Sequence, residues 1–228
     1  MNSLKRKKQG FNLLAPYYDG LVSLFFGRQL KASQAFFLNK LPPAHSILVF
    51  GCGTGSFLRD LEKHHQAERI CCVDISERMI ASSRSLINKE FPQRLVAYTF
   101  ICGSWSDIPP EVTFDWVITP YVLDCFQGTD LLRVIQGLGE RLTPDGKWLF
   151  TDFHVPKKGF FKWYALLVIR ILYAGFQLIC GLGIKRLPDF ETFFSQCHLK
   201  AEYEKYFCRG LLTSKIYSRQ SSAGIEAS

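Results

Sequence analysis

The glycine-rich loop at residues 51–55 is the feature of this sequence best suited to chemistry. It reads Gly-Cys-Gly-Thr-Gly and directly follows the apolar run Ile47–Phe50. Glycines at these positions allow a tight turn and let a ligand approach the backbone without interference from a Cβ atom. Asp74 ends the next apolar run, Arg69–Val73, where an acid can accept hydrogen bonds from both hydroxyls of a ribose. Together these residues predict a binding site for a nucleoside-containing ligand.

The residue after the third glycine narrows the choice of ligand. A dinucleotide-binding loop has glycine or alanine at this sixth position, because a helix packs closely beneath the pyrophosphate. Here the residue is Ser56. The loop is therefore a poorer match to NAD than to a nucleoside ligand without a pyrophosphate. An NAD-dependent oxidoreductase stays an alternative, since both classes share the strand–loop–helix unit.

Strand-like and helix-like segments alternate around this loop. Apolar runs typical of buried strands lie at residues 47–50, 69–73, 96–101, 115–119 and 147–152. Helical periodicity lies at residues 56–65, 77–89 and 131–141. This alternation implies βαβ units and a parallel sheet. Two further strand-like runs, at residues 201–207 and 212–218, flank a short turn and predict a closing hairpin.

The composition favours a folded protein in a reducing compartment. Hydrophobic residues make up 47% of the 228 residues and charged residues 21%, which permits a sizeable core. The eight cysteines form no CxxC pair, and the adjacent Cys71 and Cys72 would point to opposite faces of one strand. We therefore expect buried free thiols, with neither a disulfide framework nor a metal site. No secretory signal opens the chain, so we expect a cytoplasmic protein, either free or peripheral to the inner face of a membrane.

Further motifs accompany the glycine loop in a fixed order. They are Val73-Asp74-Ile75-Ser76, Phe114-Asp115-Trp116-Val117 and Leu142-Thr143-Pro144-Asp145-Gly146-Lys147. With the loop, these motifs span about residues 45–155 and resemble class I S-adenosylmethionine-dependent methyltransferases. Ala15-Pro16-Tyr17-Tyr18-Asp19 resembles the entry segment of the ubiquinone/menaquinone-type members, and residues 207–214 resemble the family's antiparallel hairpin.

The resemblance implies a particular architecture. The expected fold is α/β, with a Rossmann-like, seven-stranded, mostly parallel sheet and helices on both faces. The final hairpin strand would be antiparallel, and an apolar helical insert would precede the hairpin. We predict a single methyltransferase domain over residues 1–228, divided into an N-terminal helical cap (1–45), a cofactor-binding core (46–155), an apolar helical lid (156–190), a closing helix and hairpin (191–219) and a tail (220–228).

Carried over residue by residue, the resemblance implies a site for S-adenosylmethionine. Asp74 would hold the ribose diol, and Tyr18 would close over the cofactor from the N-terminal helix. Thr119, Pro120 and Tyr121 would border the transferable methyl group. The implied cofactor-binding set is Tyr18, Gly51, Cys52, Gly53, Thr54, Gly55, Asp74, Ile75, Met79, Ser104, Trp105, Thr119 and Pro120.

Two positions depart from the family pattern. Members usually carry an acid two residues before the first glycine, where this chain has Val49, and often an aspartate where Ser104 stands. Both changes remove polar anchors for the cofactor or the loop. Either weaker cofactor affinity or a degenerate fold that binds or regulates without turnover would follow.

Methyl transfer from a sulfonium is an in-line displacement that mainly requires positioning and the exclusion of water. Asp152 and His154 lie at the carboxyl end of the predicted fifth strand, and Tyr121 follows the fourth. Ligands of open α/β sheets bind at these strand ends. We predict these three residues as catalytic, with His154 as the first candidate for a base because its unperturbed pKa lies near neutrality.

The long apolar segment Trp163–Ile184 points to the acceptor. It is interrupted mainly by Arg170 and Gln177 and is long enough to span a bilayer. A single span, however, could not return the chain to the same sheet for a closing hairpin. We expect either a core helix or a lid over a hydrophobic acceptor, such as a quinone-like compound, a polyketide or a lipid. The basic residues within 157–186 also suit peripheral contact with a membrane.

The prediction is therefore S-adenosylmethionine-dependent methyl transfer to a small or lipid-like acceptor. The net charge of +8 also permits nucleic acid as a partner. Against this, Thr119-Pro120-Tyr121-Val122 is only weakly similar to the motif that nucleic-acid methyltransferases carry after the fourth strand. There is also no aromatic–basic platform for stacking bases, so we expect no nucleic-acid partner.

Overall fold

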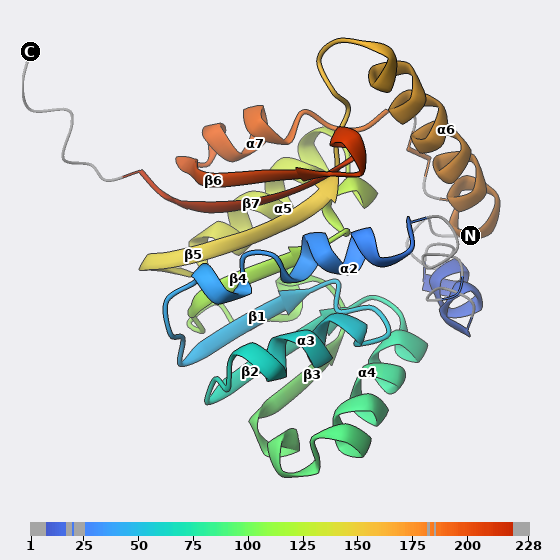
Figure 1. The fold of residues 1–228 in the computed structure, drawn as a ribbon. Helices are drawn as coiled ribbons and strands as arrows, with labels where there is room; N and C mark the ends of the chain where they lie inside the picture. The colour runs from blue at the N-terminus through green and yellow to red at the C-terminus, as the bar shows by residue number, and fades with distance from the viewer. Residues whose placement is uncertain (1–7, 17–19, 21–25, 182, 185, 221–228) are drawn as a thin grey trace, which may run out of the picture.

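The computed structural model describes residues 8–16, 20, 26–181, 183–184 and 186–220 (Figure 1). Its strands are β1 (Ser46–Phe50), β2 (Arg69–Asp74), β3 (Tyr98–Cys102), β4 (Phe114–Pro120), β5 (Leu142–Phe153), β6 (Leu199–Phe207) and β7 (Leu212–Arg219). Its helices include α2 (Arg28–Ala35), α3 (Ser56–His64), α4 (Glu77–Glu90), α5 (Gly128–Glu140), α6 (Phe160–Cys180) and α7 (Phe190–Gln196). Residues 8–16 are also helical. Short 3-10 turns lie at Leu38–Lys40, Pro92–Ala97, Trp105–Asp107, Leu123–Cys125 and Cys208–Gly210.

The strands form one seven-stranded sheet in the order β3-β2-β1-β4-β5-β7-β6. Strands β1 to β5 pair in parallel, whereas β7 pairs antiparallel with both β5 and β6. The predicted Rossmann-like fold class, with its antiparallel final strand, is confirmed. The parallel strands bring their carboxyl ends to one edge of the sheet, where open α/β sheets bind ligands.

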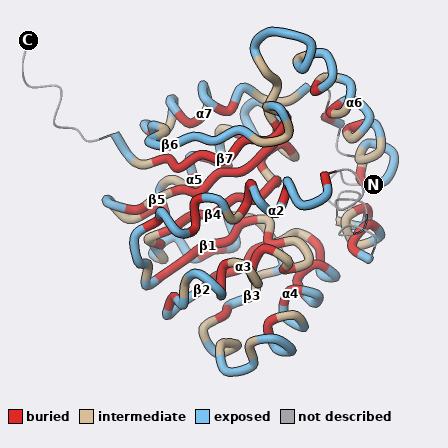
Figure 2. The backbone as a smooth tube through the Cα atoms, in the orientation of Figure 1, coloured by how far each residue is buried: buried red, intermediate tan, exposed pale blue. Residues whose placement is uncertain are grey.

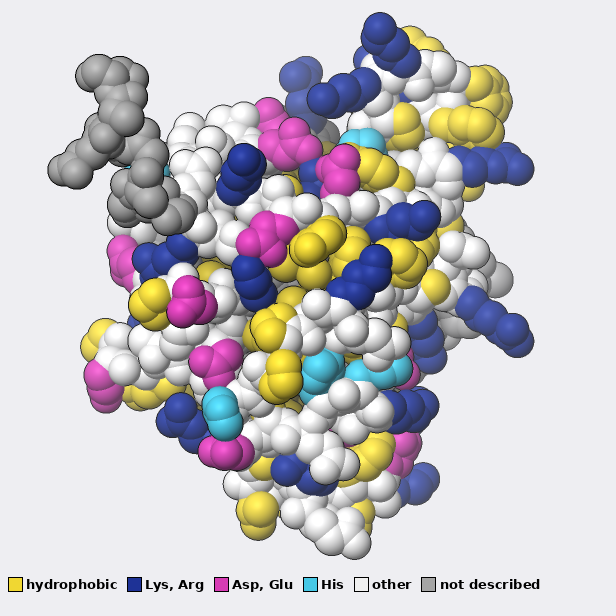
Figure 3. Space-filling model, turned by 60° about the vertical axis from the view of Figure 1, so that its left-hand side comes forward, with side chains coloured by type: hydrophobic (Ala, Val, Ile, Leu, Met, Phe, Trp, Pro, Cys, Tyr) yellow, Lys and Arg dark blue, Asp and Glu magenta, His cyan; other side chains and the backbone are white. Residues whose placement is uncertain are grey.

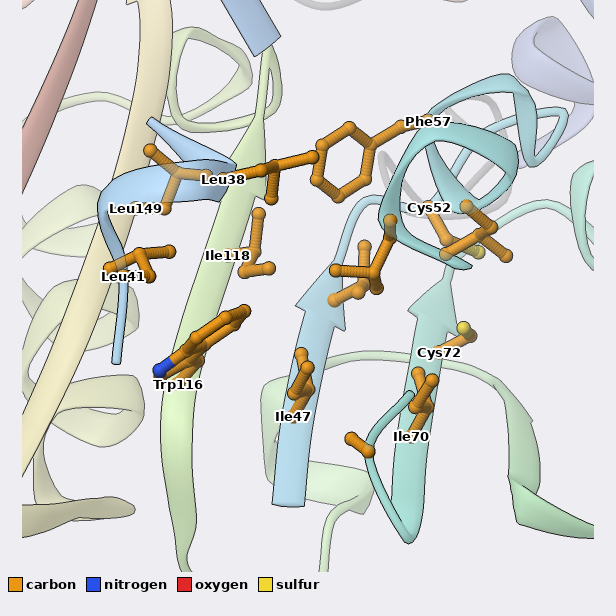
Figure 4. Packing of buried hydrophobic residues seen from close by; sticks show 14 of the residues in the cluster. Leu38, Leu41, Ile47, Cys52, Phe57, Ile70, Cys72, Trp116, Ile118 and Leu149 are labelled. Carbon is orange, nitrogen blue, oxygen red and sulfur yellow. The ribbon is translucent and has the colours of Figure 1, made fainter. Parts of the chain in front are cut away.

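Helices cover both faces of the sheet, and the strands alternate between them (Figure 1). Ile47 and Val49 pack in a cluster with residues of α3 and α4, whereas Leu48 and Phe50 pack in a cluster with residues of α5 and α7. Figure 4 shows the first cluster, in which Phe57 of α3 lies over the strands. The buried positions follow the central strands (Figure 2). Burial on both faces explains why these strands read as continuous apolar runs.

The two adjacent cysteines of β2 test this alternation directly. Cys72 belongs to the α3 and α4 cluster, and Cys71 to the α5 and α7 cluster. The prediction that they point to opposite faces is confirmed. Burial raises the pKa of both thiols, so they behave as small buried hydrophobes.

Two element boundaries differ from the prediction. The strand predicted from residue 96 begins at Tyr98, because Pro92–Ala97 forms a 3-10 turn in which Val96 is 94% exposed. The turn predicted at residues 143–146 lies inside β5. There Leu142 pairs with Phe114 and Lys147 with Trp116, so β5 accommodates the extra residues as an irregularity in its pairing with β4.

The predicted apolar insert forms α6, which stands beyond the carboxyl end of the sheet (Figure 1). Gly10 packs against it so closely that a Cβ atom there would lie 2.3 Å from Cα of Cys180. In the part of the chain that the structure describes, α6 alone is long and apolar enough to cross a membrane. The chain nevertheless returns from α6 to the same sheet, because β7 pairs with β5.

Candidate active site

A pocket opens at the carboxyl ends of β1, β2 and β4. Its wall consists of Phe11, Phe50, Gly51, Gly53, Asp74, Ile75, Met79, Gly103, Ser104, Pro120, Tyr121, Val122, Cys125 and Phe126. The topology explains the position, because β1 is flanked by β2 on one side and β4 on the other. The strand order therefore changes direction between β1 and β4. Open α/β sheets bind ligands at such a change of direction.

The glycine loop forms the floor of this pocket. The N–H of Gly51 donates to the carbonyl of Val73 at 2.8 Å, which ties the loop to the end of β2. At Gly51 the φ angle is +78°, and a Cβ atom would lie 2.5 Å from Cβ of Val122. At Gly55, with φ of +87°, a Cβ atom would lie 2.8 Å from Cα of Ser83. Both positions therefore require glycine, for backbone conformation and for space.

Asp74 connects the loop to the start of α4. Its Oδ2 accepts the N–H of Gly53 at 3.0 Å, and its Oδ1 accepts the N–H of Ser76 at 2.9 Å. Burial raises the pKa of Asp74, while these backbone donors oppose the rise. A carboxylate oxygen can accept more than one hydrogen bond, so each oxygen keeps capacity for a ligand. The side chain lines the pocket and could accept both hydroxyls of a ribose.

The N-terminal helical segment closes one side of the pocket with Phe11. The neighbouring Asn12 holds this segment, since its Oδ1 accepts the hydroxyl of Ser76 at 2.6 Å. Lys8 also pairs with Glu77, with 2.7 Å between Nζ and Oε1. These contacts join the segment to the first turn of α4, directly beside Asp74. Phe11 was not predicted as a site residue, because its helical spacing indicated only an apolar face.

The other pocket walls are mainly apolar. Met79 is 2% exposed and adjoins Ile75 in the wall. Phe50 stacks with Phe126, with 6.2 Å between ring centroids. Phe50, Val122, Cys125 and Phe126 were not predicted as site residues, although the last three directly follow β4. Such walls suit a flat ring or an apolar acceptor more than a charged group.

The segment after β3 contributes Gly103 and Ser104, but Trp105 turns away. The Trp105 ring packs on α5, where a Cβ atom at Gly137 would lie 2.3 Å from it. The N–H of Ser104 donates to Oδ2 of Asp107 at 2.7 Å. Asp107 thus places a carboxylate beside Ser104, the position at which the resemblance predicts an aspartate.

Some predicted cofactor residues lie behind the pocket wall. Thr119 is fully buried, and its hydroxyl accepts the Nε1–H of Trp148 at 2.9 Å. Cys52 is 4% exposed and packs in the core cluster. Thr54 and Gly55 belong to the loop without lining the pocket. Tyr18, and with it the predicted closure over the cofactor, lies outside the described residues.

Of the predicted catalytic residues, Tyr121 lines the pocket. Its φ of +55° is in the left-handed region, which a non-glycine residue rarely adopts. Its hydroxyl forms a hydrogen bond of 2.6 Å with Oγ of Ser33, and its ring packs against Phe153. Strained backbone of this kind often occurs at ligand sites, where the surrounding structure supports it.

Asp152 is buried outside the pocket wall, and the buried Asp124 is its neighbour. Oδ2 of Asp152 accepts the N–H of Asp124 at 3.2 Å, and its Oδ1 accepts the N–H of Phe153 at 2.8 Å. Burial raises the pKa of Asp124 to about 7. Burial and the neighbouring Asp124 charge raise the pKa of Asp152 as well. Asp124 adjoins Cys125 in sequence, and so this pair supports the segment that forms the wall.

His154 lies away from the pocket, over the hairpin. Its Nδ1 lies 2.7 Å from the carbonyl oxygen of Gly210, and its ring lies 4.6 Å from that of Tyr206. Burial is the main cause that lowers the pKa of His154, which favours the neutral ring with Nδ1–H donating. No group of three or more His, Cys, Asp or Glu side chains that could hold a metal ion occurs among the described residues.

The sheet order, the antiparallel β7 and the acid beside a glycine loop at the carboxyl edge are the arrangement expected for a class I S-adenosylmethionine-dependent methyltransferase fold. Residues 48–148 match the family model described as a methyltransferase domain. The fold and this match, which covers 101 of the 228 residues, agree with the predicted class.

Among curated relatives, the chain is similar to malonyl-[acyl-carrier protein] O-methyltransferases. It is 29% identical over 150 residues to the protein of Priestia megaterium (strain DSM 319), an alignment that covers 64% of this chain and 50% of the relative. It is 28% identical over 146 residues to that of Bacillus anthracis, covering 63% and 51%. The chain thus spans about half the length of the curated relatives it matches.

Solved structures share the fold at low sequence identity. The N-methyltransferase NodS from Bradyrhizobium japonicum, in complex with S-adenosyl-L-homocysteine, superposes with a TM-score of 0.67 at 14% identity, covering 97% of this chain and all of that one. The mitomycin 7-O-methyltransferase MmcR superposes with a TM-score of 0.66 at 16% identity, covering 92% and 60%.

Proposed function

We propose that this protein binds S-adenosylmethionine in the pocket at residues 51–55 and Asp74 and transfers its methyl group to a small, largely apolar acceptor. The observation that carries the proposal is the geometry of Asp74, whose carboxylate is held by Gly53 and Ser76 while it faces the pocket. The bound cofactor supplies the reactive sulfonium methyl group. The protein has to hold the acceptor in line and exclude water.

The apolar wall favours a neutral acceptor over an anionic one. The described pocket wall contains no lysine or arginine, and its one formally charged side chain is the carboxylate of Asp74. The relatives named malonyl-[acyl-carrier protein] O-methyltransferase have an acceptor that carries a carboxylate, for which this wall supplies no cation beyond the charge of the cofactor itself. A quinone-like, polyketide or lipid acceptor would leave no charge buried and unpaired there.

Of the predicted catalytic residues, Tyr121 has the position for direct contact with the acceptor. We assign Asp152 a positioning role, because it binds backbone N–H groups of Asp124 and Phe153. His154 bonds to the hairpin and we assign it no contact with the acceptor. The subgroup of ubiquinone/menaquinone-type enzymes and the cytoplasmic location stay predictions.

Calorimetric titration of the protein with S-adenosylmethionine and its demethylated product tests the cofactor site. We expect both to bind and NAD not to bind. Absence of S-adenosylmethionine binding by the folded protein would refute the proposal. Cofactor binding without transfer to any acceptor would instead favour a degenerate fold with a binding or regulatory role.

Transfer of a labelled methyl group then tests the acceptor class. The panel compares phenolic quinone precursors, polyketide phenols and unsaturated lipids with malonyl-carrier protein. We expect transfer to one of the neutral classes. Faster transfer to the malonyl thioester than to any neutral acceptor would show that the argument from the uncharged wall is wrong.

A further inference from the structure

Helix α6 presents an apolar stripe to solvent along its whole length. With successive residues about 100° apart around a helix, one exposed side consists of Phe160, Trp163, Tyr164, Leu167, Ile171, Ala174 and Leu178. Trp163 is 70% exposed, Leu178 82% and Phe160 77%. Only 22% of the most apolar stretch of α6 is buried. A contiguous exposed stripe of large apolar side chains marks an interaction surface rather than ordinary solvent exposure.

The opposite side of α6 is firmly packed. Ala165, Ile169 and Tyr173 are buried in one cluster with Tyr121 and Phe153. The helix therefore covers the acceptor side of the pocket, where Tyr121 lies. Turning the stripe inward would expose these buried residues, and so the stripe needs a partner outside the described fold.

The charged residues of α6 and of its flanking sequence are all basic. Between Asp152 and Asp189 the sequence contains no acidic residue and six basic ones, namely Lys157, Lys158, Lys162, Arg170, Lys185 and Arg186. Lys157, Lys158, Arg170 and Arg186 are exposed. Arg209 of the hairpin adds its guanidinium 5.0 Å from the ring centroid of Phe161. In Figure 3, hydrophobic side chains gather at the upper right, over α6, with lysine and arginine side chains beside them.

These features together resemble a helix that lies in a lipid interface. Such helices combine a wide apolar side, which includes tryptophan or phenylalanine, with lysine and arginine that contact anionic headgroups. A transmembrane orientation is excluded, since β7 returns to pair with β5 after α6. A second copy of the chain is a poorer partner, because a two-fold interface would place the same patch against itself. That arrangement would bring like charges together along the rim.

We propose that the outer face of α6 lies flat on the surface of an anionic lipid bilayer, with its apolar stripe inserted at the headgroup boundary. The binding itself does not depend on the enzymatic reaction. One consequence does rest on the proposed function: α6 packs against Tyr121 of the pocket wall, so that bilayer binding would bring the pocket close to a lipid-soluble acceptor.

Sedimentation with phosphatidylcholine vesicles, with and without phosphatidylglycerol, tests the proposal. We expect the protein to bind the anionic vesicles at low salt and to be released by high salt, with little binding to the neutral ones. The double variant Leu167→Glu and Ile171→Glu should bind at least about tenfold more weakly, because each change places a charge in the apolar layer. The control is Val96→Glu, which charges an even more exposed apolar position beside β3 and should bind like wild type.

A second pair of variants tests the electrostatic part. Each lysine near an anionic surface contributes roughly fivefold to binding, so Lys157→Gln with Lys158→Gln should weaken it roughly twenty-five-fold. Arg133→Gln on α5, whose side chain is 74% exposed, should leave binding unchanged. Cofactor titration of every variant separates this test from the proposed function, since the substituted residues lie outside the pocket wall.

Three outcomes would overturn the proposal. The first is that wild type fails to sediment with anionic vesicles at low salt. The second is that Val96→Glu loses as much binding as the stripe variant, or that the stripe variant binds like wild type. The third is that wild type does not bind vesicles but forms a dimer in size-exclusion chromatography, or a complex with an acidic carrier protein, and that the stripe variant does not form this dimer or complex.

Discussion

Replacing Asp74 by asparagine should separate the cofactor site from the rest of the fold. Both carboxylate oxygens accept backbone N–H groups, Oδ2 from Gly53 and Oδ1 from Ser76. An amide would therefore turn a donor towards one of these N–H groups, whichever way it is oriented. It would also lose the charge that strengthens hydrogen bonds to the ribose hydroxyls.

The magnitude follows from these contacts. A hydrogen bond to a charged group contributes about 1.5–3 kcal/mol. With two ribose hydroxyls on one carboxylate and partial replacement by the amide, we expect a net loss of about 3 kcal/mol, or roughly a hundredfold in Kd. Isothermal titration with S-adenosylmethionine and its demethylated product measures this loss. Because burial raises the pKa of Asp74, wild-type affinity should also fall as the pH is lowered and the carboxyl group becomes protonated.

Asp115→Asn is the matched control at the opposite edge of the sheet. Oδ2 of Asp115 accepts the N–H groups of His45 at 2.8 Å and Ser46 at 3.0 Å. The control should lower the free energy of unfolding by about 1–2 kcal/mol and leave Kd unchanged. The reasoning is refuted if folded Asp74→Asn binds within about threefold of wild type, or if Asp115→Asn weakens binding equally.

Four further substitutions test the pocket and its support. Burial raises the pKa of Asp124 to about 7, whereas an unfolded aspartate ionises near pH ~3.9, so the free energy of unfolding should fall as the pH rises from about 4 to about 7. Asp124→Asn should flatten that dependence in urea titrations, and an unchanged slope would contradict the buried-acid assignment. Gly55→Ala, whose Cβ would lie 2.8 Å from Cα of Ser83, should destabilise by about 2–3 kcal/mol, and Gly128→Ala, with positive φ but open space, by about 1 kcal/mol. His154→Gln should keep cofactor affinity and methyl transfer, because the ring bonds to the hairpin; a large fall in kcat without loss of stability would show that His154 acts in catalysis.

Much of the structure around the glycine loop could be predicted because its signals are local. The glycine loop at residues 51–55 and Asp74 both follow apolar strands, and all three glycines have positive φ angles. Backbone conformation at a loop depends on the residues in the loop itself, and so the order of residues was enough to predict the loop. The same holds for Cys71 and Cys72, whose opposite directions follow from the two-residue repeat of a strand.

Element boundaries were harder to predict for a physical reason. The Thr-Pro-Asp-Gly run at residues 143–146 has typical turn residues, yet it continues β5 as an irregular part of the ladder. This run stays in the sheet because β5 pairs with β4 on both sides of it, and local propensity does not indicate that pairing. Similarly, Val96 has strand-forming chemistry but lies exposed in a turn that Pro92 begins.

The sequence by itself determined the class of fold, the loop, the acid and the presence of an apolar helix, because each depends on spacing within a short stretch. Only the tertiary structure decided which side chains meet. It brought Phe11 and Cys125 into one pocket wall, and it directed Trp105 onto α5. It also decided which side of α6 is packed and which is exposed. These outcomes depend on contacts between residues far apart in the chain, which form only when the carboxyl ends of the strands converge.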